Sequence, residues 1–413
     1  MTRIFKSLTL LGLAGMFAVS AFAAEKKYLV TNDDNSSANT ATFYTIGAGG
    51  ALTQVKVVKT GGTGNGGGYF ASPRVGVLHD KVQSCVYISD AGSADVAAIS
   101  EATLKLVGTF KAGSTDAGTF DGVGLIANQK YLYAGFTGTS GDQGTGSIAT
   151  YKIMSGCKLK YLKSIPAKGL GSGSFGVGAP DGLGLHGKML VVAYGDGSIE
   201  SFNVSGGVPV SNGDEQNSTG EPDSYYPAGV DISADGKFAI FGDIPVNSPT
   251  YTTLEVSNIS SGKLTKTKVY GGSGGGLGQG VNSNDVEISP DESLIYVNNN
   301  GYSNGTGGGT VTAVFFNKTT GKVSKGCISP VLQGYGLEWF NGSGIALADN
   351  ASGTGSEVYV AEPAFSGSVS WIGVVDISLK GKTCSLKEAN HSFVLDGQTG
   401  NLESIASWPP RAF

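Results

Sequence analysis

Short apolar runs separated by turns recur along the chain, and the pattern repeats seven times. Each unit has a strand-like run rich in Val, Ile, Leu and Tyr, a second apolar run, a turn of small or polar residues, and a return run. The opening runs begin near seven residues, Tyr28, Val86, Leu132, Leu190, Phe238, Ile295 and Val358. Their mean spacing of about 55 residues is typical of a long propeller repeat.

An earlier apolar strand precedes the opening run in six of the seven units, and the first unit lacks it. A segment of the same kind, residues 402–407, follows the seventh unit and stops before Pro409 and Pro410, which cannot donate to a ladder. We predict that this segment forms the innermost strand of the first blade. The pattern therefore predicts an all-β fold: a seven-bladed β-propeller with four-stranded blades, closed by the C-terminal strand pairing into blade 1.

Some units carry the motifs of a known superfamily. A Ser-Pro-Asp turn at Ser289, a Tyr-Val strand at Tyr296 and a Thr-Gly-x-Val hairpin at Thr320 form one unit, Ser233 begins a second copy, and Val86 begins a partial third. In these motifs the chain resembles the seven-bladed lactonase-like propellers, which include 6-phosphogluconolactonases. The resemblance implies the propeller fold and, as one activity, lactone hydrolysis by His, Arg and Glu side chains that face the channel.

The first 24 residues have the parts of a secretory signal. Arg3 and Lys6 form a basic end, an apolar stretch follows, and Ala21 and Ala23 provide a small-residue cleavage site. The apolar stretch is short for a membrane span, and no second one follows. We predict a signal peptide at residues 1–24, a single propeller domain at residues 25–413, a secreted or periplasmic location, and no membrane span.

Four cysteines in an exported chain fit two disulfides, for which three pairings exist. Cys85 and Cys157 fall in adjacent units, and so do Cys327 and Cys384. We predict these two pairs as links between neighbouring blades, worth about 2 to 4 kcal/mol each. A metal site is the alternative, but the chain lacks the Cys-x-x-Cys spacing typical of such sites.

The formal net charge is −5, and only two arginines, Arg74 and Arg411, follow the signal segment. Without a basic stripe, nucleic acid is not an expected partner. The 67 glycines and the 15% of charged residues indicate many turns and short strands. The 40% hydrophobic fraction favours a large core over disorder.

Polar residues stand where the predicted innermost strands begin, at one mouth of the central channel. The candidate ligand-binding residues are Arg74, Asp121, Asp181, Asn284, Asp285 and Glu403. Their mostly negative charge would suit a hard cation such as Ca²⁺, or a small polar ligand held opposite the arginine. The alternative is that these Asp and Asn residues only cap turns at the strand entries.

Two further acids, Asp231 and Glu287, occupy an inner-strand position that is glycine in other units. A carboxylate inside an apolar strand is costly unless it is paired. These side chains therefore lie near the channel or accept hydrogen bonds from backbone donors. If they face each other across neighbouring blades, at least one has a raised pKa.

The leading hypothesis is an exported binding module that uses the channel mouth and its Gly- and Asn-rich loops for a cation, a glycan or another protein. No organic cofactor is expected. The alternative, implied by the resemblance, is a lactone hydrolase centred on Arg74, Asp121, Asp181 and Glu403. His79, His186 and His391 lie far apart in the sequence, and none matches the position of a lactonase histidine. A purely structural envelope protein is a third possibility.

Overall fold

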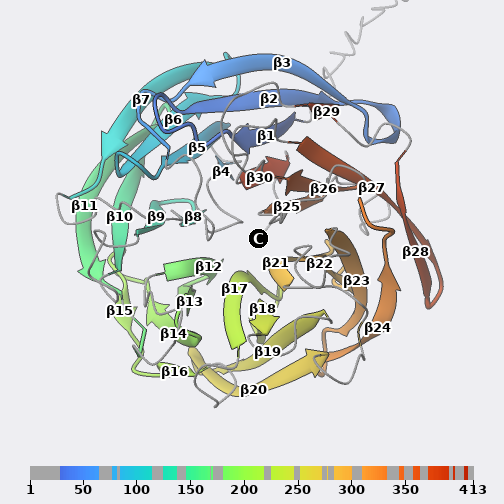
Figure 1. Ribbon diagram of the computed structural model, residues 1–413. Helices are drawn as coiled ribbons and strands as arrows, with labels where there is room; N and C mark the ends of the chain where they lie inside the picture. The colour runs from blue at the N-terminus through green and yellow to red at the C-terminus, as the bar shows by residue number, and fades with distance from the viewer. Residues whose placement is uncertain are drawn as a thin grey trace, which may run out of the picture.

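The computed structural model describes residues 28–64, 77–80, 84–113, 124–136, 146–167, 169–170, 180–217, 225–245, 252–271, 277, 283–299, 309–332, 344–347, 357–362, 371–389, 394–395 and 404–407. These residues form seven antiparallel sheets, which stand as blades around a central axis (Figure 1). Within these ranges there is no α-helix, and one 3-10 turn, η1, spans Ala48–Gly50. The predicted seven-bladed β-propeller is confirmed.

The first three blades have four strands each, which follow one another from the axis outward. Blade 1 contains β30 (Ser404–Ser407), β1 (Tyr28–Asn32), β2 (Thr40–Ile46) and β3 (Leu52–Lys59). Blade 2 contains β4 (Val77–Asp80), β5 (Cys85–Asp90), β6 (Asp95–Ser100) and β7 (Lys105–Lys111). Blade 3 contains β8 (Gly124–Ala127), β9 (Tyr131–Phe136), β10 (Ser147–Met154) and β11 (Lys158–Pro166).

The other four blades repeat this plan, and in two of them the outer position is shared by two short strands. Blade 4 contains β12 (Pro180–His186), β13 (Met189–Tyr194), β14 (Ser198–Asn203), β15 (Val210–Ser211) and β16 (Gln216–Asn217). Blade 5 contains β17 (Tyr225–Ile232), β18 (Phe238–Pro245), β19 (Thr253–Ser260) and β20 (Lys263–Gly271). Blade 6 contains β21 (Ser283–Ile288), β22 (Leu294–Asn299), β23 (Thr310–Asn317) and β24 (Lys322–Ile328). Blade 7 contains β25 (Gly344–Leu347), β26 (Glu357–Glu362), β27 (Trp371–Lys380), β28 (Thr383–Glu388) and β29 (Val394–Leu395).

The two ends of the described chain meet in blade 1. The strand β30 runs antiparallel to β1, with Val30 opposite Ala406 and Thr31 opposite Ile405. In Figure 1 the red β30 lies beside the blue β1 close to the axis. The C-terminal strand therefore supplies the innermost strand that the first unit lacks, and the predicted ring closure is confirmed.

The hydrophobic core lies between the blades rather than inside any one of them. On β1, Val30 packs toward blade 2 in a cluster with Val86, and Leu29 packs toward blade 7 in a cluster with Tyr359. Because neighbouring blades cover both faces of the strand, all five residues of β1 are buried. This double burial explains why the opening runs are continuously apolar instead of alternating with polar residues.

The glycines of the outer hairpins allow one blade to approach the next. Gly50 has φ +75°, and a Cβ there would lie 2.6 Å from Cγ of Glu357 in blade 7. The hydroxyl of Tyr359 donates to the Gly50 carbonyl oxygen at 3.0 Å. Gly207 has φ +90°, and its carbonyl oxygen accepts from the hydroxyl of Tyr133 in blade 3 at 2.9 Å. At these two hairpins, the glycine therefore allows the turn to pack against the preceding blade.

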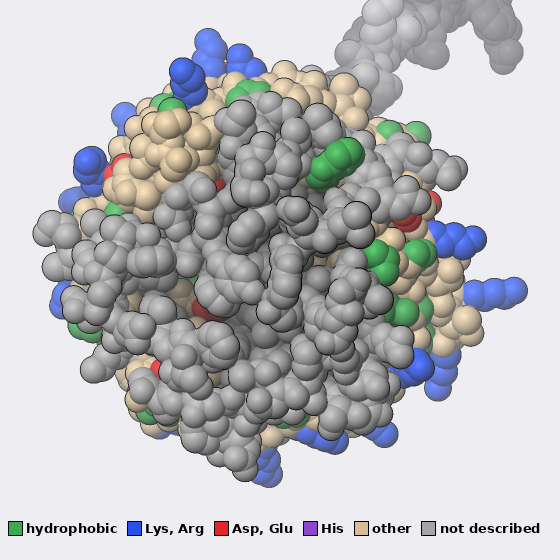
Figure 2. Space-filling view, in the orientation of Figure 1, with side chains coloured by type: hydrophobic (Ala, Val, Ile, Leu, Met, Phe, Trp, Pro, Cys, Tyr) green, Lys and Arg blue, Asp and Glu red, His purple; other side chains and the backbone are tan. Residues whose placement is uncertain are grey.

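Bulges and lysines occupy the exposed outer edge of the ring. The ladder register shifts in five outermost strands: β3, β7, β11, β20 and β24. Lysine side chains project from the circumference in Figure 2. Bulges and charged side chains both prevent an edge strand from pairing with another chain. The bulges therefore interrupt a regular ladder along each of these outermost strands.

Two disulfides join neighbouring blades. Cys85 on β5 is bonded to Cys157, in the turn that follows β10, so that blades 2 and 3 are linked. Cys327 on β24 is bonded to Cys384 on β28, so that blades 6 and 7 are linked. The Cα atoms of each pair are 5.6 Å apart. Both predicted pairings are confirmed.

Removing β30 is expected to open the ring. A chain that ends at residue 403 should lose more than about 3 kcal/mol of unfolding free energy, because it loses the ladder with β1 and exposes apolar inner strands. Urea unfolding of this variant, beside one that ends at residue 407, measures the effect. Equal denaturation midpoints for the two truncated chains would contradict the closure.

Replacing both cysteines of one disulfide by serine should lower the unfolding free energy by about 2 to 4 kcal/mol for either pair. The two bonds close loops of similar length, with sequence separations of 72 and 57. Chemical denaturation of the two double variants, Cys85→Ser with Cys157→Ser and Cys327→Ser with Cys384→Ser, checks this. A change below about 0.5 kcal/mol for both would refute the prediction.

Candidate functional site

Two of the predicted mouth residues lie at bulges where the innermost strands begin. Pro180 and Gly182 pair with adjacent residues of β13, so that Asp181 is the extra residue in β12. Asn284 is the extra residue at the same place in β21, and both side chains are half-buried. The aligned position in β17, Ala228, lies in a similar irregularity. Bulges redirect side chains out of the ladder and are common next to binding sites.

Asp231 and Asp285 connect neighbouring innermost strands. Asp231 is buried, and its Oδ2 accepts from the Ile288 N–H of blade 6 at 2.9 Å, while Oδ1 accepts from the N–H of the next residue at 2.8 Å. Asp285 is also buried, and its Oδ2 accepts from the Ile345 N–H of blade 7 at 3.1 Å. Backbone donors therefore stabilise both carboxylates, and each carboxylate joins two blades.

Glu287 faces a different blade from Asp231. Its neighbours Val286 and Ile288 pack in a cluster with blade 5, and successive strand residues alternate between the two faces. Glu287 therefore faces blade 7, whereas Asp231 reaches blade 6. The two acids do not face each other, so the arrangement under which a raised pKa was expected does not occur.

Several sequence candidates fall outside this part of the structure. Arg74, Asp121 and Glu403 lie outside the described residues, and so does His391. The Nε2 atom of His186 lies 3.0 Å from the carbonyl oxygen of Ala234. His186 ends β12, so it stands at the opposite end of blade 4 from Asp181. It is not part of the predicted channel mouth.

Buried polar side chains also lie at or near the ends of several second strands, at the end of the ring where the innermost strands begin: Asn32, Asp90, Asp243 and Asn299. Two of them bind the preceding blade. The Oδ1 atom of Asp90 accepts from Asn39 Nδ2 at 2.8 Å and from Thr60 Oγ1 at 2.7 Å, both in blade 1. The Oδ1 atom of Asn299 accepts from Thr252 Oγ1 of blade 5 at 3.3 Å. These contacts fix the angle between adjacent blades.

The pKa of the Asp90 carboxyl group, in this layer, is strongly perturbed. Its side chain is fully buried, and Oδ2 has no hydrogen-bond partner among the described residues. Gly62 packs directly on it, because a Cβ at that position would lie 2.5 Å from Oδ2. Burial raises the pKa of Asp90 to about 7, although the hydrogen bonds from Thr60 and Asn39 favour the charged form.

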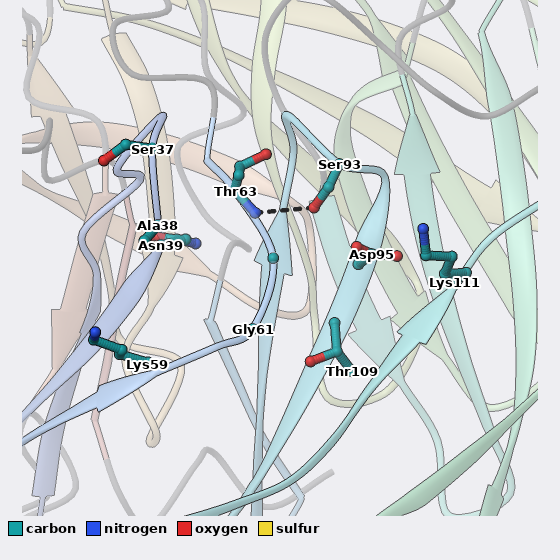
Figure 3. A pocket seen from close by; sticks show the side chains of 11 residues that line it. Ser37, Ala38, Asn39, Lys59, Gly61, Thr63, Ser93, Asp95, Thr109 and Lys111 are labelled. Atoms are coloured by element: carbon teal, nitrogen blue, oxygen red, sulfur yellow. Dashed lines mark hydrogen bonds between the residues drawn. The ribbon is translucent and has the colours of Figure 1, made fainter.

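A pocket of about 400 Å³ lies beside this network, between blades 1 and 2 (Figure 3). Its walls are the turn between β1 and β2, the segment 61–63, and residues of β6 and β7. Asp95 contributes a carboxylate to the wall, and its cross-strand partner Lys111 also lines the pocket. Burial raises the pKa of Asp95. Lys59 approaches from the other side of the 61–63 segment in Figure 3.

A second buried acid pair lies in blade 5. Asp243 and Glu255 are on adjacent strands, and both are fully buried. Burial, followed by the charge of Glu255, raises the pKa of Asp243 well above its ordinary value. Because solvent does not reach either group, neither can meet a dissolved ligand.

The sequence analysis missed the residues of the pocket. Asp90 and Asp95 bracket the turn Ala-Gly-Ser-Ala, and Asn39 belongs to a polar run that begins at Asp33. A sequence signal existed, because second strands repeatedly end in Asp or Asn where an apolar residue would suit the core. Asn39 and Asp90 are 51 residues apart in the sequence. Their hydrogen bond could be recognised only once the positions of blades 1 and 2 were known.

Comparison with solved structures places this architecture among known propellers. A protein of Bacteroides fragilis provisionally named 6-phosphogluconolactonase is 17% identical, with a TM-score of 0.63 over 93% of this chain and 99% of that chain. A Bacteroides uniformis protein with the same provisional name is 13% identical, with a TM-score of 0.61 over 92% and 99%. The periplasmic gluconolactonase of Pseudomonas aeruginosa is 14% identical, with a TM-score of 0.50 over 73% and 81%.

No family model matches the chain, and no curated protein matches it. The structural likeness shows that the chain has the fold of the lactonase-like β-propellers. At these identities it shows the fold and no particular activity.

Among the described residues, no three His, Cys, Asp or Glu side chains gather as metal ligands. In the same part, no helix is long and apolar enough to cross a bilayer.

Asp90→Asn should flatten the dependence of stability on pH. The unfolded carboxyl titrates near 3.8 and the folded one near 7. The contribution of Asp90 is therefore complete below about pH 4 and is lost as the pH rises to about 7, by roughly 4 kcal/mol. Urea unfolding at pH 4 and pH 8 measures the difference between the wild type and the variant.

Asp235→Asn is the matched control. Burial is the largest single influence on the pKa of this exposed acid and raises it, but the hydrogen bonds from Lys237 and Ser233 and the charge of Lys237 together outweigh burial and lower the pKa. The contribution of Asp235 is lost as the pH falls, which is the opposite sign. Identical pH profiles for the wild type and Asp90→Asn would contradict the assignment.

Proposed function

We propose that this protein is an exported propeller that binds a small polar ligand at the end of the ring where the innermost strands begin. The observation that supports this most directly is the pair of bulges at Asp181 and Asn284. They place two half-buried polar side chains, in blades 4 and 6, at equivalent positions near the axis. Arg74, Asp121 and Glu403 align with them in the sequence and complete the proposed set.

Binding is favoured over catalysis by the state of the nearby carboxylates. Asp231 and Asp285 are buried and accept hydrogen bonds from backbone N–H groups of two strands each. Each of the four carboxylate oxygens accepts a backbone hydrogen bond, and both side chains are buried, so neither is placed to contact a bound substrate. Buried acids near the axis therefore support the frame, and the half-buried residues at the bulges are the ones proposed to meet a ligand.

The ligand chemistry follows from the oxygen atoms of these side chains. Carboxylate and amide oxygens suit a hard cation such as Ca²⁺, and the same groups accept hydroxyl donors from a glycan. Another protein that presents such groups could dock through the loops at this end. Nucleic acid is not proposed, because the net charge is −5.

Export is supported by two observations. The segment 1–24 has the composition of a secretory signal, and the chain carries two disulfides between blades. Disulfides persist in oxidising compartments such as the periplasm or the extracellular space. We therefore propose a secreted or periplasmic location for the propeller.

Lactone hydrolysis is the second candidate function. It is favoured by the likeness in fold to a periplasmic gluconolactonase and to two proteins provisionally named 6-phosphogluconolactonase. In this alternative, Arg74 would hold a carboxylate or lactone oxygen, and Glu403, Asp121 or Asp181 would transfer a proton.

Thermal unfolding of the purified protein with calcium chloride and with a chelator tests the proposal. Calcium should raise the unfolding temperature, because a ligand that binds only the folded state stabilises it, by roughly 2.7 kcal/mol at a hundredfold excess over Kd. Asp181→Asn should reduce this shift. Asp376→Asn, an equivalent change at an exposed residue of β27, should leave it intact.

A lactone panel separates the two candidate functions. The binding proposal expects no turnover. Turnover that Arg74→Ala abolishes would establish the hydrolase and overturn the proposal. The absence of any stabilisation by calcium and by a panel of neutral sugars would also overturn it.

A further inference from the structure

The pocket between blades 1 and 2 lies away from the axis and is separate from the channel mouth. Lys59 ends β3 and Lys111 ends β7, which are the outermost strands of their blades (Figure 1). The axial candidates Asp181 and Asn284 belong to blades 4 and 6. A ligand in this pocket would therefore occupy a second site.

The lining combines hydroxyl groups with small apolar surfaces, which suits a ligand that carries both hydroxyl groups and C–H faces. Four hydroxyl side chains face the cavity: Ser37, Thr63, Ser93 and Thr109. The other small lining residues are Ala38, Gly61 and Gly62, and no aromatic or large aliphatic side chain contributes. Apolar atoms make up most of the lining surface, but none belongs to a large apolar side chain, so hydrogen bonds and charge have to provide the specificity.

Asp95 requires a donor from the ligand. Its side chain is 3% exposed, and Oδ1 has no hydrogen-bond partner among the described residues. A buried acceptor left without a partner costs about 1 to 3 kcal/mol. A ligand hydroxyl that donates to the Asp95 carboxylate would recover this free energy.

Two ammonium groups make the rim of the pocket positive, although the charge of Lys111 already interacts with its cross-strand partner Asp95. Lys59 and Lys111 are exposed, both line the pocket, and neither forms a salt bridge within the part of the chain that the structure describes. Figure 3 shows them on opposite sides of the 61–63 segment. A ligand carboxylate near this pair would be attracted from both sides.

The base of the pocket is already ordered. The Thr63 N–H donates to Ser93 Oγ at 2.9 Å, which fixes the central segment against blade 2 (Figure 3). Asn39 and Thr60 hold the buried Asp90 carboxylate beneath it. Binding therefore need not order these loops, which lowers its entropic cost.

We propose that this pocket binds an acidic saccharide unit, whose ring hydroxyls donate to Asp95 and whose carboxylate is attracted by the charges of Lys59 and Lys111 at the rim. A volume of about 400 Å³ admits roughly one or two sugar rings. A free amino acid would fill a small part of the space, and a bare divalent cation would be repelled by both lysines. This site is distinct from the channel mouth, and its ligand does not depend on the proposed function.

Calorimetric titration of the mature protein with glucuronate and with a galacturonate dimer tests the proposal. The expected result is that one of these acidic sugars binds, and that glucose binds at least about tenfold more weakly. Asp95→Asn should weaken acidic-sugar binding by about tenfold or more, since a charge-assisted hydrogen bond is lost. The double variant Lys59→Ala with Lys111→Ala should bind glucuronate and glucose alike.

Matched variants complete the design. Lys56→Ala with Lys105→Ala removes two exposed lysines from the same two strands, outside the pocket, and should leave binding unchanged. Asp181→Asn should also leave it unchanged, so that failure of the axial proposal and failure of this one are distinguishable. If Asp95→Asn does not fold, Ser93→Ala together with the double lysine variant decides the outcome.

Three results would overturn the inference. The first is no binding of either acidic sugar. The second is binding that neither Asp95→Asn nor the double lysine variant weakens. The third is binding of inorganic phosphate, glycine or calcium that is as tight as that of glucuronate and is lost in the same variants, since the pocket would then be a simple ion or zwitterion site.

Discussion

The whole ring depends on a ladder between the two ends of the chain. The segment β30 lies against β1, and the pairing of Thr31 with Ile405 gives blade 1 its innermost strand. Without that strand, blade 1 would present an open edge at the axis, where apolar clusters join it to blades 2 and 7. Closure therefore converts seven locally folded sheets into one cooperative body, in which every blade is covered on both faces.

Polar contacts then set how the blades sit against one another. Apolar packing between sheets tolerates small rotations, whereas a hydrogen bond from Tyr359 to Gly50, or from Ile288 to Asp231, does not. The Asp90 carboxylate, held by Asn39 from the neighbouring blade, serves the same purpose at a higher electrostatic cost. Residues that resemble catalytic acids in the sequence thus fix the register between blades.

The sequence was sufficient for features that depend on order along the chain. Strand number, the donated segment containing Ile405, and the Cys85–Cys157 link follow from the period, because neighbouring units become neighbouring blades. The sequence was insufficient for contacts between two blades, because these contacts depend on distances that the repeat period does not give. Asp231 was recognisable as an acid in an apolar strand, but its donor lies 57 residues away. The pocket at Asp95 was missed for the same reason.

The most direct test of the account is amide hydrogen exchange of β30 in the intact protein. The amides of residues 404–407 that pair with β1 should exchange only by global unfolding, with protection equal to that of the buried strand β5. Their exchange rate should then rise in step with β5 as denaturant is added. Exchange of residues 404–407 at the rate of a free tail, with β5 still protected, would contradict the claim that the ends of the chain close the ring.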